Sequence, residues 1–255
     1  MNYYLVLFLI VMGYMTAWFA VSLIVKRNDI ADVAWGIGFV LLAWTSYFLS
    51  KNTHWSHILV NSLVTIWGLR LSYHIFNRNR KKPEDYRYAE WRKQWGRLFY
   101  IKSFLQVFVL QGILLFLISI PVTILNKSGA QNVPTFAFVG AAIWTIGFIF
   151  ESVGDDQLSK FIKNPDNGGK VLNTGLWKYS RHPNYFGEVT QWWGIWIISV
   201  CITNNWFTIV GPSLITFLIL KVSGIPLLEE KMATQPEYGE YASKTSMFIP
   251  WFPKS

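Results

Sequence analysis

Long apolar runs are the feature that most restricts how this chain can fold. Tyr3–Val25, Ile101–Leu125 and Phe136–Phe150 reach or approach the roughly 20 apolar residues that cross about 30 Å of hydrocarbon. Only 15% of the residues are charged, whereas a soluble domain has about a quarter. A soluble fold would need amphipathic segments to cover these runs, and the sequence offers none. We therefore predict an integral membrane protein.

The apolar runs predict seven membrane-spanning helices in one domain over residues 1–255. The predicted spans lie near residues 2–25, 30–50, 57–77, 101–125, 134–156, 185–203 and 205–224. Strands of a membrane barrel would alternate in hydrophobicity with a period of two, and these runs are continuous. The predicted fold is all-α and multi-pass.

Lysine and arginine in the connections predict the orientation. The first, third and fifth connections are basic, and the third, residues 78–97, is densely so. The even-numbered connections hold one lysine or none. Seven spans meet this alternation with the N-terminus outside and the C-terminus in the cytoplasm. The net charge of +9 then suits membrane lipids or an anionic cofactor. It does not indicate nucleic acid, because the cations form no separate basic domain.

Polar and ionisable side chains gather at the predicted cytoplasmic ends of the spans. They are Asp29, Asp32, Arg70, His74, Arg78, Glu151, Asp155, Asn184 and Glu188. Such residues are costly in a membrane and mark candidate functional sites. Structural alternatives exist: Asp29 suits a helix N-cap, and Arg70 suits an ion pair with Glu151 or Asp155.

The segment Thr174–Glu188 is the most specific local pattern, and it includes the run Arg-His-Pro-Asn at Arg181–Asn184. Pro183 fits the first turn of a helix. Polar side chains would then meet at a helix N-terminus, where anions bind well; they are Arg181, His182, Asn184, Tyr185 and Glu188. An interfacial aromatic belt is the alternative, and it explains Trp177 and Tyr179 but not the other polar residues.

Several common sites are missing from the sequence. Glycine-rich phosphate loops and the Gly-x-Ser-x-Gly motif do not occur. His54 and His57 have no companion carboxylates in their connection, so we predict no metal site. The single cysteine, Cys201, fits a small apolar residue better than a nucleophile.

The segment Thr174–Glu188 resembles the C-terminal domain of membrane steroid 5α-reductases. The whole chain is similar to the bacterial branch of that superfamily, whose hallmarks here are Asp29–Gly36, Trp67–Leu71, Glu84–Tyr88, Glu151–Gln157 and Phe248–Trp251. The resemblance covers nearly all of the chain, with a reductase-like half at about 134–255. It implies seven helices, NADPH held at the cytoplasmic side, and reduction of a carbon–carbon double bond conjugated to a carbonyl. It also implies a bacterial inner membrane and a hydrophobic, steroid- or lipid-like substrate.

The resemblance also implies a set of cofactor-binding residues. Asn184 and Glu188 match a cofactor-contacting pair, and Asp155 matches an upstream aspartate. Glu151 stands where the steroid enzymes have asparagine. The complete predicted set is Arg70, Arg78, Arg87, Glu151, Asp155, Lys170, Tyr179, Arg181, His182, Asn184, Tyr185 and Glu188.

The expected catalytic residues depart from the steroid enzymes. Those enzymes polarise the substrate carbonyl with the glutamate of a Gln-Glu pair and a tyrosine; this chain has no such pair, and Ile75 stands at the matched tyrosine position. The nearest acid is Asp32. We therefore predict that a protonated Asp32, helped by Tyr73 or His74, polarises the carbonyl.

Two other functions are compatible with the sequence. Membrane methyltransferases that act on isoprenylcysteine or phospholipids and bind S-adenosylmethionine share an Arg-His-Pro-x-Tyr-x-Gly core, and Arg181–Gly187 satisfies it. A non-catalytic lipid-binding or transport scaffold is the second alternative. The sequence favours the reductase through Asn184 and the full-length resemblance, and it leaves the oligomeric state open.

Overall fold

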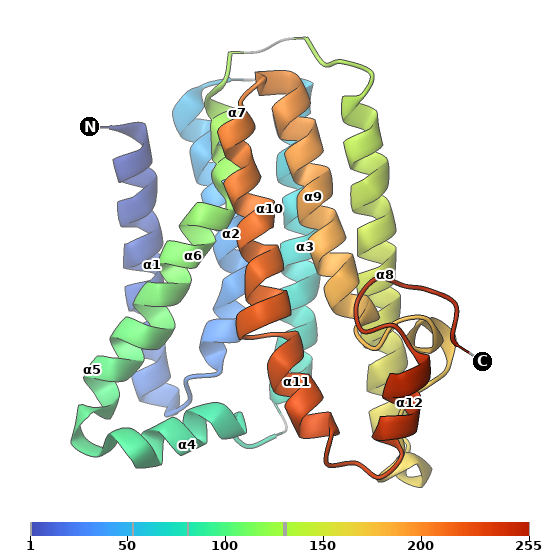
Figure 1. Cartoon of the computed structure of the whole chain (residues 1–255). Helices are drawn as coiled ribbons and strands as arrows, with labels where there is room; N and C mark the ends of the chain where they lie inside the picture. Colours follow the sequence, from blue (N-terminus) through green and yellow to red (C-terminus); the bar gives the residue numbers. More distant parts are fainter. Residues whose placement is uncertain (1, 53, 81, 130–131, 255) are drawn as a thin grey trace. The chain divides into compact units, whose positions relative to one another are not determined.

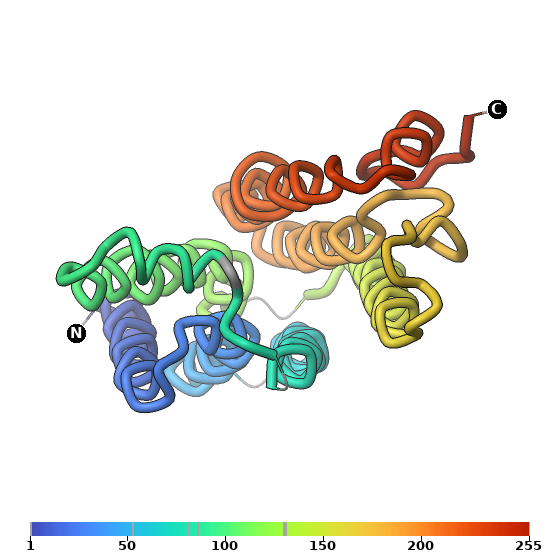
Figure 2. The backbone as a smooth tube through the Cα atoms, turned by 90° about the horizontal axis from the view of Figure 1, so that it is seen from below, coloured from blue at the N-terminus to red at the C-terminus, as the bar shows by residue number. Residues whose placement is uncertain are grey.

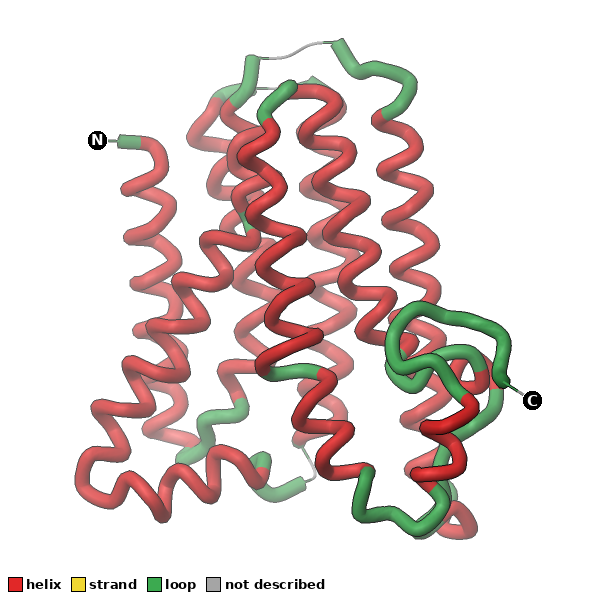
Figure 3. Tube along the Cα trace, in the orientation of Figure 1, coloured by secondary structure: helices red, strands yellow, loops and turns green. Residues whose placement is uncertain are grey.

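The computed structural model describes residues 2–52, 54–80, 82–129 and 132–254, and these residues form helices and connections without strands (Figure 3). The α-helices are α1 (Tyr3–Val25), α2 (Ile30–Ser50), α3 (Trp55–Asn79), α4 (Tyr86–Trp95), α5 (Phe99–Ser103), α6 (Leu110–Ile118), α7 (Ile120–Lys127), α8 (Ala137–Lys163), α9 (Pro183–Thr203), α10 (Val210–Phe217), α11 (Ile225–Met232) and α12 (Tyr238–Lys244). Short 3-10 turns lie at Gly96–Leu98, Pro165–Asn167, Gly175–Lys178 and Trp206–Ile209. Two segments, Phe104–Val109 and Leu218–Val222, are π-helical.

The chain divides into two compact units. Unit 1 comprises Met1–Val133 with Ile202–Val210, and unit 2 comprises Pro134–Cys201 with Gly211–Ser255. Each unit has its own set of polar side chains, and each set is described within its unit.

Helix α2 is the centre of unit 1 and packs against α1, α3 and α7 (Figure 1). Its contact face is apolar, and Phe39 and Leu42 are almost completely buried together with Trp67 of α3. The Ser72 hydroxyl of α3 donates to the Val33 carbonyl of α2 at 2.8 Å. Small and polar side chains at such interfaces let membrane helices approach closely.

Helices α8 and α9 of unit 2 touch backbone to backbone along a seam of glycines. A Cβ on Gly187 would lie 2.4 Å from the Glu151 nitrogen and 2.5 Å from the Gly147 oxygen. Gly140 of α8 and Gly194 of α9 approach each other in the same way, seven residues along each helix from Gly147 and Gly187. The glycines of α8 recur every seven residues, so they occupy one face of the helix. The seam fixes α9 against α8 at the level of Glu151 and Asp155.

Five helical stretches of the described chain are long and apolar enough to cross a membrane, as expected for an integral membrane protein. They are Tyr3–Val25, Ile30–Ser50, Arg87–Ile118, Ala137–Lys163 and Trp206–Met232. Helices α3 and α9, with 25 and 21 residues, are not among them, because they carry more polar side chains. A seven-span topology with the N-terminus outside stays a prediction.

Two predicted segments differ in detail from the structure. The predicted span 101–125 is not one continuous α-helix: it includes a π-helical stretch and breaks at Ser119, where Pro121 starts α7. The connection 78–97 contains the ten-residue helix α4, where the sequence predicts only a basic loop.

Candidate functional site

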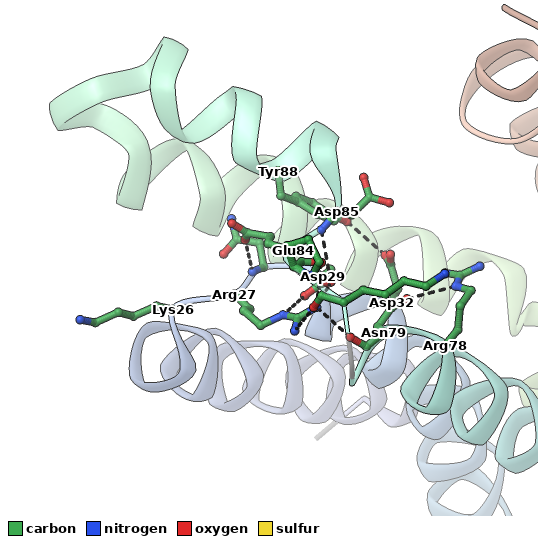
Figure 4. Close-up of polar contacts among 12 residues, drawn as sticks. Lys26, Arg27, Asp29, Asp32, Arg78, Asn79, Glu84, Asp85 and Tyr88 are labelled. Carbon is green, nitrogen blue, oxygen red and sulfur yellow. Dashed lines mark hydrogen bonds and ion pairs between the residues drawn. The ribbon is translucent and has the colours of Figure 1, made fainter. Parts of the chain in front are cut away.

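Arg27 ties the α1–α2 turn of unit 1 to the α3–α4 connection while it pairs with the buried Asp29 (Figure 4). Arg27 donates to both oxygens of Asp29, at 2.9 and 2.6 Å. The same guanidinium donates to the backbone carbonyls of Asn79, Lys82 and Pro83. The Asp29 carboxylate is only 2% exposed and makes no capping bond to α2. Asp29 thus occupies the N-cap position of α2, as considered from the sequence, but its side chain serves as an ion-pair partner and not as a cap.

Glu84 fixes the position of α4 through a second set of bonds. Its carboxylate accepts from the Asn28 backbone N–H at 2.7 Å and pairs with Arg92 of α4 at 3.2 Å. The Asn28 side chain donates to the Ser103 hydroxyl at 2.7 Å. Asn28, just before α2, is thus bonded to Glu84 before α4 and to Ser103 at the end of α5.

Asp32 lies at the open edge of this cluster. The Tyr88 hydroxyl donates to Asp32 Oδ1 at 3.1 Å, and an Arg87 nitrogen lies 3.8 Å from Oδ2. The Asp32 side chain remains 22% exposed. Burial raises the pKa of Asp85, but hydrogen bonds and charge from Arg87 outweigh that effect and hold its pKa below the ordinary value. Asp32 and Arg87, with side chains 22% and 32% exposed, are the part of this group that a ligand can reach, while Tyr88 is buried.

The other predicted residues of unit 1 lie on α3. Tyr73 is 70% exposed, and Arg78 is exposed, with its Nε donating to Asn79 Oδ1 at 3.1 Å. Arg70 and His74 are half-buried. The hydroxyl that contacts Asp32 belongs to Tyr88, the last residue of the Glu84–Tyr88 hallmark.

Two of the predicted cofactor residues of unit 2 are paired across the glycine seam. The Asn184 amide of α9 donates to Asp155 Oδ1 of α8 at 3.0 Å. One turn away, the Gln191 amide donates to Glu151 Oε2 at 2.5 Å. Both carboxylates are more than 90% buried. The sequence predicted Asp155, Asn184 and Glu151 as members of one site, and the structure places them on adjoining helix faces.

Glu229 of α11 gathers three donors around one carboxylate. Arg181 Nη1 donates to Oε2 at 2.5 Å, and both His182 Nε2 and the Tyr238 hydroxyl bond to Oε1, at 2.6 and 2.5 Å. His182 is almost fully buried and stacks on Tyr185, with ring centroids 5.9 Å apart. The Arg-His pair of the predicted motif is therefore oriented by a carboxylate from a distant helix.

The backbone just before α9 is bonded to the C-terminal segment 246–251. Arg181 N–H donates to the Ser246 carbonyl at 2.8 Å, and Trp251 N–H donates to the Tyr179 carbonyl at 2.9 Å. The Ser180 hydroxyl donates to the Phe248 carbonyl at 2.8 Å. The hallmark Phe248–Trp251 thus supports the segment that carries Arg181 and His182.

The other predicted residues of unit 2 are more open. Lys170 is exposed and Tyr179 is 36% exposed, so both can meet a ligand from solvent. Glu188 is half-buried on α9. No cluster of three or more metal-ligating side chains occurs within the described ranges.

Sequence reasoning missed Glu229, Tyr238, Gln191 and Tyr88. Glu229 lies 47 residues from His182, so no local spacing could identify it. A partial signal was available for Gln191, because it follows Asn184 by seven residues and so shares its helix face.

The pH dependence of stability provides a test of the His182 environment. Burial lowers the pKa of His182, although the Glu229 bond opposes the effect. The unfolded chain binds this proton near pH 6.5, and the folded chain binds it only at lower pH. The contribution of His182 to the free energy of unfolding is therefore fully present above about pH 6.5. It decreases as the pH falls toward the pKa of His182 in the folded protein. In His182→Gln, which does not titrate, the melting temperature should fall less between about pH 7 and 5.5. His54→Gln is the control; equal slopes in wild type and His182→Gln would contradict the assignment.

The helices and the polar sites together define an integral membrane protein with buried carboxylates, one just before α2 and two within α8. The sequence matches the family described as Protein of unknown function (DUF1295) over residues 18–245, and the chain belongs to this family. It is 23% identical over 260 residues to the uncharacterized protein C594.04c of Schizosaccharomyces pombe, across 90% of this chain and 74% of the yeast protein.

Two other relatives are similar over shorter regions. 3-oxo-5-alpha-steroid 4-dehydrogenase 1 of Bos taurus is 38% identical over 55 residues, which is 22% of this chain and 21% of the relative. The probable O-methyltransferase ustE of Ustilaginoidea virens is 29% identical over 129 residues, which is 49% of this chain and 43% of the relative. No solved structure matches significantly. The distant similarity to steroid 5-alpha-reductases supports the superfamily, while membership of its bacterial branch stays a prediction.

Proposed function

We propose that this protein is a membrane reductase that uses NADPH to reduce a carbon–carbon double bond conjugated to a carbonyl. The substrate would be hydrophobic, steroid- or lipid-like, and would arrive from the membrane, which the resemblance implies to be the bacterial inner membrane. One observation supports the proposal most: Asn184 donates to Asp155 at 3.0 Å, next to the buried Glu151. These three positions are among those that the resemblance to steroid 5α-reductases assigns to the cofactor.

The side chains of unit 2 fit the chemistry of NADPH, which supplies hydride when bound. Carboxylates and amides such as Asp155 and Asn184 can bond the hydroxyls of a ribose and the amide of a nicotinamide. Lys170 and Lys178 are exposed and suit phosphate groups. Arg181 has five N–H donors, and the bond to Glu229 uses one of them. In unit 1, we propose Arg70, Arg78 and Arg87 as phosphate ligands, because their side chains are also positively charged.

In unit 1 we assign polarisation of the substrate carbonyl to Asp32. A protonated Asp32 can donate through one oxygen while the other accepts from Tyr88. Tyr88 is then a positioning residue for Asp32, and Tyr73 or His74 remains the proposed helper in polarising the carbonyl. Such a donor stabilises the negative charge that develops on the carbonyl oxygen.

Tyr88→Phe is expected to lower kcat about ten-fold, because it removes a hydrogen bond worth roughly 1.4 kcal/mol. The melting-temperature shift produced by NADPH should be unchanged. Tyr100→Phe, at a tyrosine that is 60% exposed in the same unit, is the matched control. A wild-type kcat in Tyr88→Phe would remove Tyr88 from the mechanism.

NADPH oxidation tests the proposed function directly. Purified protein in detergent is incubated with steroid, sterol and isoprenoid enones while absorbance at 340 nm is followed. We expect enone-dependent loss of NADPH with at least one class. Absence of oxidation with all classes, together with no stabilisation by NADPH, would reject the reductase.

A methyltransferase is the second candidate, favoured by the 129-residue similarity to the probable O-methyltransferase ustE. The pattern Arg181–Gly187 is compatible with it. A ligand that binds the folded state raises the melting temperature, so the two cofactors can be compared directly. Stabilisation by S-adenosylmethionine and not by NADPH would favour the methyltransferase, and the reverse result the reductase.

A further inference from the structure

Helix α4 has a different direction from its neighbours in unit 1. In Figure 1 it runs across the lower ends of α1 and α2, and Figure 2, which looks along the long helices, shows it lengthwise. Gly96 follows α4 with a φ of 47°, a conformation that favours glycine. This turn redirects the chain into α5. The N-terminal part of the apolar stretch Arg87–Ile118 therefore lies crosswise to the helices that follow it.

Two of the three carboxylates around α4 are already paired with arginines of the same cluster. Glu84 pairs with Arg92, and Asp85 with Arg87. Glu90 accepts from Gln94 at 3.2 Å. The exposed cations beside them are Lys82, Lys93 and Arg97, and no ion pair involving them is found within the described part of the chain. The outer side of α4 therefore carries excess positive charge.

Aromatic and apolar side chains accompany these cations. The rings of Trp91 and Trp95 stack with centroids 5.1 Å apart and an angle of 17°, and Lys102 Nζ lies 5.8 Å from the Trp95 ring. Just after Gly96, Leu98 and Ile101 are 54% and 61% exposed. Tryptophan prefers the membrane–water interface, and helices with basic and apolar faces lie in that plane. Segment 82–102 has both properties.

We propose that the α4 surface, formed by Lys82, Trp91, Lys93, Trp95 and Arg97 with Leu98 and Ile101, binds the headgroups of anionic phospholipids. Lys93 and Arg97 meet the phosphates, while the tryptophans lie at the level of the glycerol backbone. Because α4 is bonded to the start of α2 through Glu84 and Asn28, bound lipid also holds the Asp32 edge of the cluster in place.

Lipid titration of the full-length protein tests the α4 surface. Native mass spectrometry in detergent gives the apparent affinity for phosphatidylglycerol relative to phosphatidylcholine. Each cation near an anionic surface contributes about five-fold to binding, so Lys93→Gln/Arg97→Gln should weaken the preference about 25-fold. Lys163→Gln/Lys254→Gln removes the same charge at two other exposed lysines and should leave the preference within about two-fold of wild type.

The salt dependence of lipid binding by the wild-type protein provides an independent test. About 0.5 M NaCl should remove most of the phosphatidylglycerol preference, since salt screens exposed charges. Equal losses in both double variants would mean that only net charge matters and would overturn the proposal. Displacement of the lipid by millimolar inorganic phosphate would also overturn it, because it would indicate a site for a free anion.

Discussion

Asn184→Asp is expected to lower NADPH-dependent turnover by about a hundred-fold. The amide of Asn184 donates to Asp155, which is only 7% exposed. An aspartate at 184 would replace this bond with a second carboxylate in a buried place, and two like charges there cannot both ionise readily. Loss of one oriented donor in an active site costs about 100- to 1,000-fold in rate. Steady-state NADPH oxidation with the best enone measures the effect.

The control for this variant is Asn173→Asp. Asn173 is exposed, so the substitution adds the same charge without facing a buried carboxylate, and turnover should stay within about two-fold of wild type. Thermal unfolding of both variants separates lost activity from lost structure. Wild-type turnover in a folded Asn184→Asp protein would exclude the Asn184–Asp155 pair from the site.

Gly187→Ala is expected to destabilise the protein by about 3 kcal/mol, the upper part of the usual range for overpacking. The added Cβ would lie 2.4 Å from the Glu151 nitrogen and 2.5 Å from the Gly147 oxygen. Both are backbone atoms of a neighbouring helix, so no side-chain rotation relieves the clash. Thermal unfolding in detergent should show a large fall in melting temperature, and Glu151 should lose its bond with Gln191 as the helices separate.

Gly13→Ala in α1 is the matched control, because nothing lies within 4 Å of the added Cβ. Alanine favours a helix more than glycine does, so this variant should be neutral or slightly stabilised. Similar melting temperatures for Gly187→Ala and Gly13→Ala would show that the α8–α9 seam tolerates a wider separation.

The sequence predicted single helices better than it predicted interrupted ones. The expected spans 2–25 and 30–50 agree closely with Tyr3–Val25 and Ile30–Ser50, because uninterrupted apolar runs leave only the ends to decide. The expected span 205–224 instead begins with a 3-10 turn and ends in a π-helical stretch before Gly224. The hydrophobicity of the residues does not indicate where an α-helix gives way to a 3-10 or a π-helix. Helix α4 escaped prediction because its short, polar pattern looks like a basic loop.

For the candidate site, the sequence could predict only which residues share a face of the same helix. Four-residue spacing correctly placed Glu151 and Asp155 on one face, and a turn structure with Pro183 correctly placed Asn184 at the start of α9. Partners from other helices could not be found in this way. Glu229 meets His182 from 47 residues away, and Tyr88 meets Asp32 from 56 residues away. Those pairings depend on tertiary packing, for which a single sequence gives no direct signal.

The glycine seam also limits how unit 2 can move. Sliding of α9 along α8 would drive Cα atoms such as that of Gly187 into the facing carbonyls, so shear between these two helices is blocked. The separation of Asp155 and Asn184 should then stay constant when other parts of unit 2 move. Any rearrangement within unit 2 must then leave α8 and α9 in place and break hydrogen bonds elsewhere, such as those of Glu229 on α11 and those between residues 246–251 and the segment before α9.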